Sequence, residues 1–187
     1  MSTATETSAA RYAKGSVILH WLIALLIALN YVAAWVSEDM PKEQAAQIMG
    51  NHKAFGITIL VLTVVRIIWR LTHPAPPLSE NLKAWEAKLA KAAHGLLYLL
   101  MLAIPASGWA MSSAWTGGEA INIFGLFGWP GLPFEQSKEL AHTLGEGHEV
   151  MATAMLVLMA IHVIGALKHQ FVDKDRNALA RMTMRKP

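Results

Sequence analysis

Four long runs of apolar residues, separated by polar and turn-rich segments, dominate the pattern of this chain. They cover residues 16–37, 52–71, 94–112 and 148–168. A helix needs about 20 mostly apolar residues to cross a bilayer, so each run is long enough to span one. Unbroken apolar runs exclude a membrane β-barrel, because its strands alternate apolar and polar side chains. The pattern therefore predicts an all-α fold, a polytopic membrane four-helix bundle that forms a single domain over residues 1–187.

The connecting segments carry turn signals and differ in charge. SEDMPKEQ makes a short acidic loop between the first two runs. RLTHPAPP ends the second run with three prolines, and SENLKAWEAKLAKAAHG predicts an interfacial helix, capped by Ser79, that leads directly into the third run. Pro105 and Gly108 predict a kink within the third run. The next segment, SSAWTGGEAINIFGLFGWPGLPFEQ, is rich in glycine and aromatic residues, and we expect it to lie across the outer face as a lid.

Composition and charge indicate a membrane protein and its orientation. Hydrophobic residues make up 54% of the chain and charged residues 16%, whereas a soluble domain carries about 25% charged residues. One side of the predicted bundle has only Lys42, Lys53 and Lys138 as basic residues. The other, basic side should face the cytoplasm, which places both termini there and argues against a nucleic-acid partner. The basic side holds Arg11, Lys14, Arg70, Lys83, Lys88, Lys91, Lys168, Lys174, Arg176, Arg181, Arg185 and Lys186.

Two further features narrow the class of protein. The first apolar run is longer than the apolar core of a signal peptide, which is about 7–15 residues, so we expect it to be retained. The chain has no cysteine. Disulfides, iron–sulfur ligation and covalent haem attachment through a C-x-x-C-H motif are therefore excluded.

Histidines within the apolar runs match one another in depth. His148 and His162 are 14 residues apart, so they share one helix face and lie about 21 Å apart along the axis. With four alternating crossings, His52 lies near the outer side of its helix and His20 near the inner, cytoplasmic side of the first. Depth therefore pairs His52 with His148 at the outer level and His20 with His162 at the inner level.

Two imidazoles at one depth suit the two axial positions of a haem. Both positions filled by histidine are typical of electron-transfer haems rather than oxygen-binding ones. Zinc is less favoured, because a structural zinc site takes four tightly grouped ligands. A single histidine at a helix end is more often an interfacial or hydrogen-bonded side chain, but the matched depths favour ligation of all four. The sequence thus predicts two non-covalent haem b groups between the helices, with iron held by His20 and His162, and by His52 and His148.

Three more ionisable residues lie toward the inner side. Arg66 should face the bundle interior and pair with an anion such as a haem propionate or a group in a quinone pocket. The alternative is a side chain that extends to the inner headgroups. His94 and His169 are candidate proton-exchanging partners of a quinone or propionate contacts, or else interfacial histidines among lysines. We expect no function for His73 and His142, which lie in loops.

The chain closely resembles the bacterial cytochrome b561 family, through VILHW, GNHKAFGITILVLTVVRIIWR, AHGLLYLLMLAIPASGW and GHEVMATAMLVLMAIHVIGALKHQF. Members of that family are four-helix, di-haem b cytochromes of the bacterial inner membrane, related to the cytochrome b subunits of nickel–iron hydrogenases. The resemblance implies that His20, His52, His148 and His162 hold the two haems.

One branch of this family is superoxide oxidase. It takes electrons from superoxide at the periplasmic face and passes them to ubiquinone near the cytoplasmic face. The histidine at the position of His169 is implicated near that quinone. Gln170 follows here, where a second histidine can stand in the family, so this chain departs from the pattern at the quinone pocket.

These features give one leading hypothesis for function and two rivals. The leading one is an oxidoreductase that conducts electrons across the inner membrane from superoxide to ubiquinone, with His169, Arg66 and His94 at the quinone and proton side. Superoxide needs a positive outer pocket, for which Lys53 and Lys138 are the available residues. The first rival is an electron-relay subunit that serves a periplasmic donor, a dehydrogenase or a hydrogenase. The second is a small transporter with histidines in its pathway and no haem.

Overall fold

The computed structural model describes residues 12–76, 83–173 and 182, and four long helices account for most of them. They are α1 (Lys14–Glu38), α2 (Lys42–Thr72), α3 (Ala84–Thr116) and α4 (Lys138–Phe171), and each is long and apolar enough to cross a membrane. Each predicted apolar run lies within one of these helices. The predicted cap at Ser79, the N-terminal segment and the basic tail lie outside the described residues.

Three helices, α2, α3 and α4, each begin ten residues before their apolar runs, and local signals explain the early starts of α3 and α4. The mixed-charge stretch before the third run joins it without a break, so α3 begins at Ala84, where the Lys83 backbone N–H donates to the Glu86 carboxylate at 3.1 Å. It continues through Pro105 as one helix and ends at Gly117, which has φ +74°. The Ser137 hydroxyl accepts a hydrogen bond from the Leu140 N–H at 3.2 Å and starts α4 ten residues before the predicted run.

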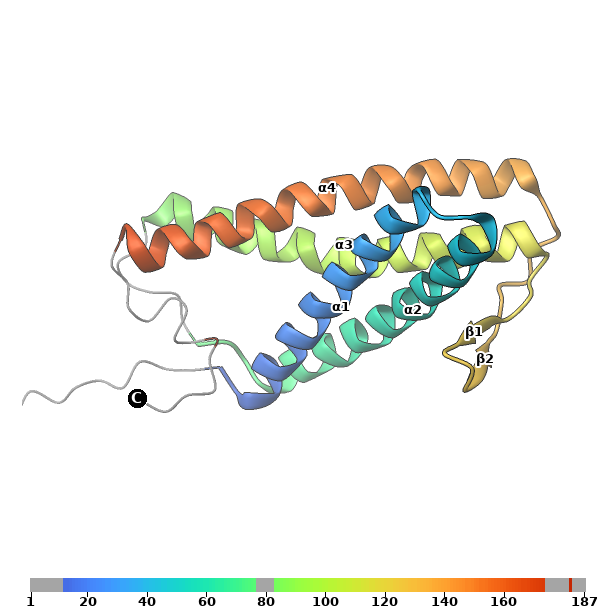
Figure 1. Ribbon diagram of the computed structural model, residues 1–187. Coiled ribbons are helices and arrows are strands. Elements are labelled where there is room, and N and C mark those ends of the chain that lie inside the picture. The colour runs from blue at the N-terminus through green and yellow to red at the C-terminus, as the bar shows by residue number, and fades with distance from the viewer. Residues whose placement is uncertain (1–11, 77–82, 174–181, 183–187) are drawn as a thin grey trace, which may run out of the picture.

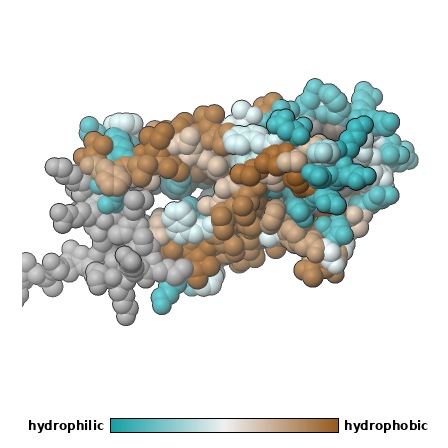
Figure 2. Space-filling view, viewed as in Figure 1, coloured by the Kyte–Doolittle hydropathy of each residue, from teal (hydrophilic) through white to brown (hydrophobic). Residues whose placement is uncertain are grey.

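The four helices form two antiparallel pairs (Figure 1). α1 packs along α2, α3 packs along α4, and α2 joins the pairs through its contact with α3. The pairs lie close together at the end where α4 begins and diverge toward the end where α1 begins and α4 ends. In Figure 2 an opening between the two pairs is visible near the diverging end. Side chains from facing helices must therefore reach across a gap there.

Most large apolar side chains of the helices point outward. The central core is small and is built from Ile23, Ile27, Ile59, Leu100, Met101 and Met155. Leu25, Val157 and Ile164 are each more than half exposed, and the brown surface in Figure 2 runs along the helices. Such a surface is costly in water and suits contact with lipid. The chain is a multi-pass membrane protein.

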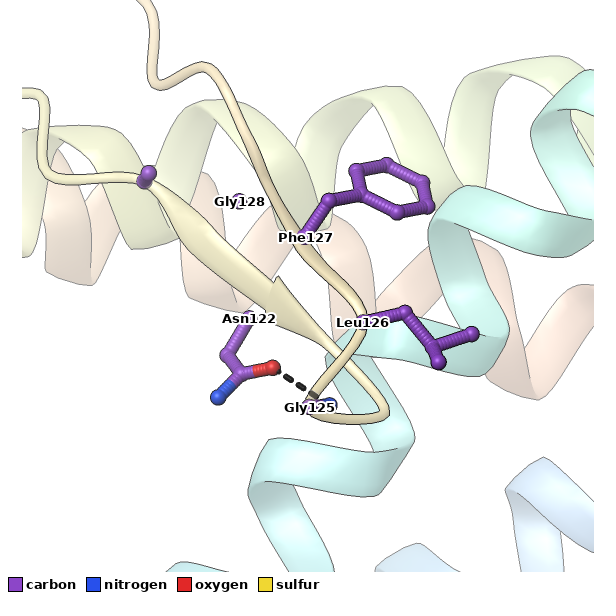
Figure 3. Close-up of a pocket in the computed structure, with 6 residues that line it drawn as sticks. Asn122, Gly125, Leu126, Phe127 and Gly128 are labelled. Atoms are coloured by element: carbon purple, nitrogen blue, oxygen red, sulfur yellow. Dashed lines mark hydrogen bonds between the residues drawn. The ribbon is translucent and has the colours of Figure 1, made fainter.

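The outer segment after α3 folds into a β-hairpin, which the turn signals did not reveal. Strands β1 (Ile121–Ile123) and β2 (Phe127–Trp129) pair antiparallel. Phe124 and Gly125 both have positive φ, 53° and 76°, and the Asn122 side-chain oxygen accepts the Gly125 N–H at 2.7 Å (Figure 3). We expected a lid across the end of the bundle; instead, the hairpin packs against the flank of α2.

Residues on the two faces of the hairpin have different surroundings. Ile121 and Ile123 are buried with Ala54 and Ile57 of α2. Leu126, at the tip, is 79% exposed beside a shallow pocket of about 250 Å³ that the hairpin residues form (Figure 3). None of the paired histidines lines this pocket, so it is separate from the chemistry considered below.

Candidate functional site

The outer histidine pair joins α2 to α4. The ring centroids of His52 and His148 are 6.2 Å apart, and the rings are inclined by 69°. Nδ1 of His52 lies 3.2 Å from the Asn30 carbonyl oxygen, and Nδ1 of His148 lies 3.0 Å from the Ile104 carbonyl oxygen. Because a carbonyl only accepts, both Nδ1 atoms carry the proton in this arrangement. Each Nε2 atom therefore keeps its lone pair available for a metal.

The inner pair joins α1 to α4, across the side where the helical pairs diverge. The centroids of His20 and His162 are 6.4 Å apart, with an inclination of 66°. His94 of α3 is a third imidazole here, 5.2 Å from the His162 centroid, and its Nδ1 lies 2.6 Å from the Ala90 carbonyl oxygen. The structure therefore brings together both pairs that the depth argument selected, and adds His94 to the inner one.

The spacing of both pairs fits two axial ligands of one metal. A metal–imidazole nitrogen bond is about 2.0–2.1 Å, and the ring centroid lies about 1.1 Å behind the nitrogen, so two such rings on opposite sides of a metal have centroids about 6.3 Å apart. The two measured distances, 6.2 and 6.4 Å, agree with this value. Within the described ranges no three His, Cys, Asp or Glu side chains gather around one metal position. The donor sets thus suit a cofactor that supplies the remaining ligands itself, as a porphyrin does.

Glycines leave room beside the histidines. A methyl group on Gly108 of α3 would lie 3.1 Å from Cε1 of His148, so a larger residue would require the ring to move away from this helix by a few tenths of an ångström. Gly56 and Gly165 stand one helical turn from His52 and His162 and have no atom within 4 Å of an added Cβ. Open space next to each pair is what a flat macrocycle needs. From the sequence, Gly108 was assigned only to a predicted kink, because its contact partner, His148, comes from another helix.

Arg66 is the intramembrane cation, and it faces the inner pair. Its Nη1 lies 3.1 Å from Nδ1 of His20, and its Nε–H donates to the Tyr98 hydroxyl at 3.0 Å. No carboxylate of the described segments forms an ion pair with it. A cation in a membrane interior requires an anion, and the propionates of a haem would provide one. The predicted inward orientation is observed; the contact with Tyr98 was not predicted.

His169 lies apart from both pairs, in a charged network at the inner end of α4. Its Nδ1 is 2.7 Å from the Asp173 carboxylate, which also accepts from Lys168 at 2.9 Å. Lys168 reaches Glu86 of α3 at 2.9 Å as well. Hydrogen bonds from Lys168 and His169 hold the pKa of Asp173 below its usual value. This network ties α3 to α4 and leaves Nε2 of His169 free of this ion pair.

A second pocket, of about 550 Å³, opens at the outer end between α3 and α4. Lys53 and Glu149, the neighbours in sequence of the outer histidines, both line it. Its remaining lining is Met111, Ser112, Trp115, Lys138, Ala141, His142, Gly145 and Glu146. The structure thus gathers Lys53 and Lys138, the two lysines named from the sequence, into one site. The carboxylates of this pocket, Glu146 and Glu149, both come from α4 and agree with the acidic outer side of the sequence, whereas its apolar lining by Met111 and Trp115 comes from α3 and was not predicted.

The two histidines for which we expected no function have ordinary structural contacts. His142 lies within α4 and not in a loop as we expected, because that helix begins at Lys138, and His73 directly follows the last residue of α2. His73 stacks on Trp69 with 3.9 Å between ring centroids, and His142 forms an exposed ion pair with Glu146 at 3.5 Å. Neither belongs to a histidine pair.

Comparison with known proteins gives a consistent picture over nearly the whole chain. A family model described as prokaryotic cytochrome b561 matches residues 11–185. The chain is 32% identical over 183 residues to cytochrome b561 homolog 2 of Escherichia coli K12, covering 92% of this chain and 90% of that protein. It is 33% identical over 174 residues to a protein of Yersinia pestis named probable superoxide oxidase CybB, covering 90% and 93%. It is also 33% identical over 180 residues to cytochrome b562 of Cereibacter sphaeroides, covering 93% and 96%.

Proposed function

Because this chain belongs to the prokaryotic cytochrome b561 family, we propose that it oxidises superoxide at its outer side and reduces ubiquinone at its inner side. Members of this family are membrane electron carriers with b-type haem. The observation that supports this most is the presence of two histidine pairs at the spacing of axial ligands, 6.2 and 6.4 Å, whose α4 members, His148 and His162, lie at different depths of that helix. A haem held by each pair would supply one-electron transfer through the membrane.

Each part of the chain has a distinct task in this proposal. The imidazoles of His52 and His148 hold the outer haem iron, and those of His20 and His162 hold the inner one. Backbone carbonyls bind the Nδ1 atoms of the outer imidazoles and so orient each ring, which leaves Nε2 available to the metal. The apolar core around Met155 separates the two levels.

The outer pocket is the proposed entry point for superoxide. Lys53 and Lys138 attract the anion, and Lys53 is adjacent to His52 in the chain. The name of the Yersinia pestis relative supports superoxide as the donor. In the balanced reaction, two superoxide ions give two molecules of dioxygen and two electrons, and ubiquinone takes up those electrons with two protons to form ubiquinol.

The inner end is the proposed quinone and proton side, with His169, His94 and Arg66. The Asp173 carboxylate fixes the His169 ring through Nδ1, so Nε2 is positioned to exchange a proton with a quinone oxygen. His94 lies beside His162 and is exposed, which suits proton exchange with water. By the positive-inside rule this end faces the cytoplasm, with both termini, in the bacterial inner membrane.

A second candidate is an electron-relay subunit that serves a partner dehydrogenase or hydrogenase. The outer pocket favours it in one respect: Glu146 and Glu149 stand beside the two lysines, and a volume of about 550 Å³ exceeds what superoxide requires. A larger donor or a docked protein would use more of this surface.

The test is a partner-free assay of the purified, haem-loaded chain with a superoxide source and ubiquinone. We expect one ubiquinol for every two superoxide ions consumed. Lys53→Glu should lower the superoxide-dependent rate at low ionic strength, while Lys42→Glu, a change of equal charge outside the pocket, should not. Haem that is reduced only when a partner protein is added would favour the relay. A chain that binds no haem would refute both.

A further inference from the structure

The groups that face the Nδ1 atoms of the rings differ between the two histidine pairs. In the outer pair, Nδ1 of each ring faces a backbone carbonyl oxygen, at 3.2 and 3.0 Å. In the inner pair, the guanidinium of Arg66 lies 3.1 Å from Nδ1 of His20. With iron bound through Nε2, Nδ1 would carry a proton, so Arg66 would act on this ring through its charge and not as a hydrogen-bond donor. A carbonyl carries partial negative charge, and an arginine carries a full positive charge at any physiological pH. The chain thus provides the two levels with different fields.

The guanidinium of Arg66 is held in place. Its Nε–H donates to the Tyr98 hydroxyl at 3.0 Å, and its Cζ lies 5.6 Å from the centroid of the same ring. The side chain is half-buried within α2, and no carboxylate of the described segments is paired with it. Its charge is therefore weakly screened by solvent and acts at close range on His20.

The two effects act at different sites and in opposite directions, so both increase the difference in reduction potential between the outer and the inner site. A carbonyl that accepts from a ligand imidazole makes that ligand more basic, which favours the oxidised metal. A fixed cation next to a ligand favours the added electron, because the reduced centre carries one less positive charge. The second effect does not depend on whether the guanidinium also contacts a propionate, since the positive charge stays beside the site.

We propose that Arg66 is a positioning residue that raises the reduction potential of the haem at His20 and His162 above that of the haem at His52 and His148, and so directs electrons inward. This inference rests on the proposed assignment of the two histidine pairs as haem sites. Arg66 acts through its charge and through Tyr98, which holds the guanidinium next to His20.

The test is an equilibrium redox titration of the full-length, haem-loaded protein, followed by haem absorbance. Arg66→Met should make one of the two haems at least tenfold harder to reduce, which is about 59 mV for a one-electron couple. Arg66→Lys should retain most of the wild-type value. Tyr98→Phe, which keeps the charge but removes its anchor, should shift the same haem in the same direction by less.

Arg70 provides the matched control. It lies one turn beyond Arg66 on α2, is exposed and contacts Tyr12 instead of a histidine, with its Cζ 5.7 Å from that ring. Arg70→Met should leave both potentials unchanged. If Arg66→Met shifts neither haem, or shifts both equally, the inference is wrong. If Arg66→Met fails to bind haem, Tyr98→Phe decides, because an unchanged or raised potential there also refutes it.

His162→Ala separates this inference from the function on which it rests. In that variant only the outer haem should remain, and adding Arg66→Met should not move its potential. If His162→Ala instead keeps both haems, the pairing itself is wrong. If His162→Ala loses one haem, but Arg66→Met changes neither potential in protein that keeps all four paired histidines, the pairing stands and only the tuning role of Arg66 is refuted.

Discussion

Replacing Gly108 by alanine should selectively weaken haem binding at the outer site. The added methyl group would lie 3.1 Å from Cε1 and 3.3 Å from Nδ1 of His148, whereas carbon atoms in contact are normally about 3.5–4.0 Å apart. The ring must therefore retreat by about 0.4 Å or more. It is also held by the Ile104 carbonyl at 3.0 Å, which limits where it can go.

The size of the effect follows from how strictly a metal bond is defined. A displacement of about 0.4 Å exceeds the roughly 0.2 Å within which metal–ligand distances are maintained. Losses caused by mispositioned ligands are typically about 10- to 100-fold in affinity, or about 1.4–2.7 kcal/mol. We expect Gly108→Ala to bind the outer haem more weakly by this factor and the inner haem normally.

The measurement is a titration of haem-free protein with haem, followed by absorbance and checked by total haem content. Gly147→Ala is the control, since Gly147 precedes His148 directly but has no atom within 4 Å of an added Cβ. Two equally tight haems in Gly108→Ala would refute the role of this glycine. Loss of the inner haem instead would refute the assignment of His148 to the outer level.

Three further predictions address the inner site, the outer loop and the inner network. His162→Ala should bind one haem per chain, because His162 has the axial spacing to His20, whereas His94→Ala should still bind two haems; pyridine haemochrome content measures both. Ser113→Ala should lower the free energy of unfolding by about 1–3 kcal/mol in a denaturant titration, since the buried Ser113 hydroxyl accepts the Leu132 N–H at 3.0 Å and its loss leaves that donor unsatisfied. The pKa of Asp173 in the folded protein is lowered from 3.8. Its contribution to the free energy of unfolding is therefore present above that pH and is lost as the pH falls through the lower, folded value. Asp173→Asn should remove this part of the pH dependence of the free energy of unfolding.

The sequence was sufficient for the helices and for the pairing of the histidines, because both follow from spacing along an axis. A separation of 14 residues determines the depth and the face of His148 and His162 on one helix, and alternating crossings supply a partner for each. Hydropathy identified only the most apolar part of α2, α3 and α4, whose first turns extend into polar sequence at Lys42, Ala84 and Lys138.

Features that depend on contacts between helices could not be predicted from the sequence. Tyr98 is separated from Arg66 by 32 residues, and nothing local to either indicates the hydrogen bond between them. The hairpin at residues 121–129 was missed because its turn places a phenylalanine, Phe124, at φ 53°, where Asn, Asp or Gly is usual. Its buried face on Ala54 and Ile57 compensates for that unfavourable turn residue.

The arrangement of the helices would give the two proposed haem sites a structural role beyond electron transfer. α4 contributes one histidine to each pair, and the partners come from α1 and α2, which form the other antiparallel pair. Each site therefore bridges the gap between the two helical pairs, which Figure 1 shows widening toward the inner end. The apolar core that joins them is small, and lipid supplies no hydrophobic force between helices. Ligation from both sides of the gap should then hold the pairs at the spacing that the imidazoles require, so the cofactors stabilise the same geometry that binds them. This explains why the ligands lie on different helices of opposite pairs: a site within one pair would bind haem without fixing the bundle.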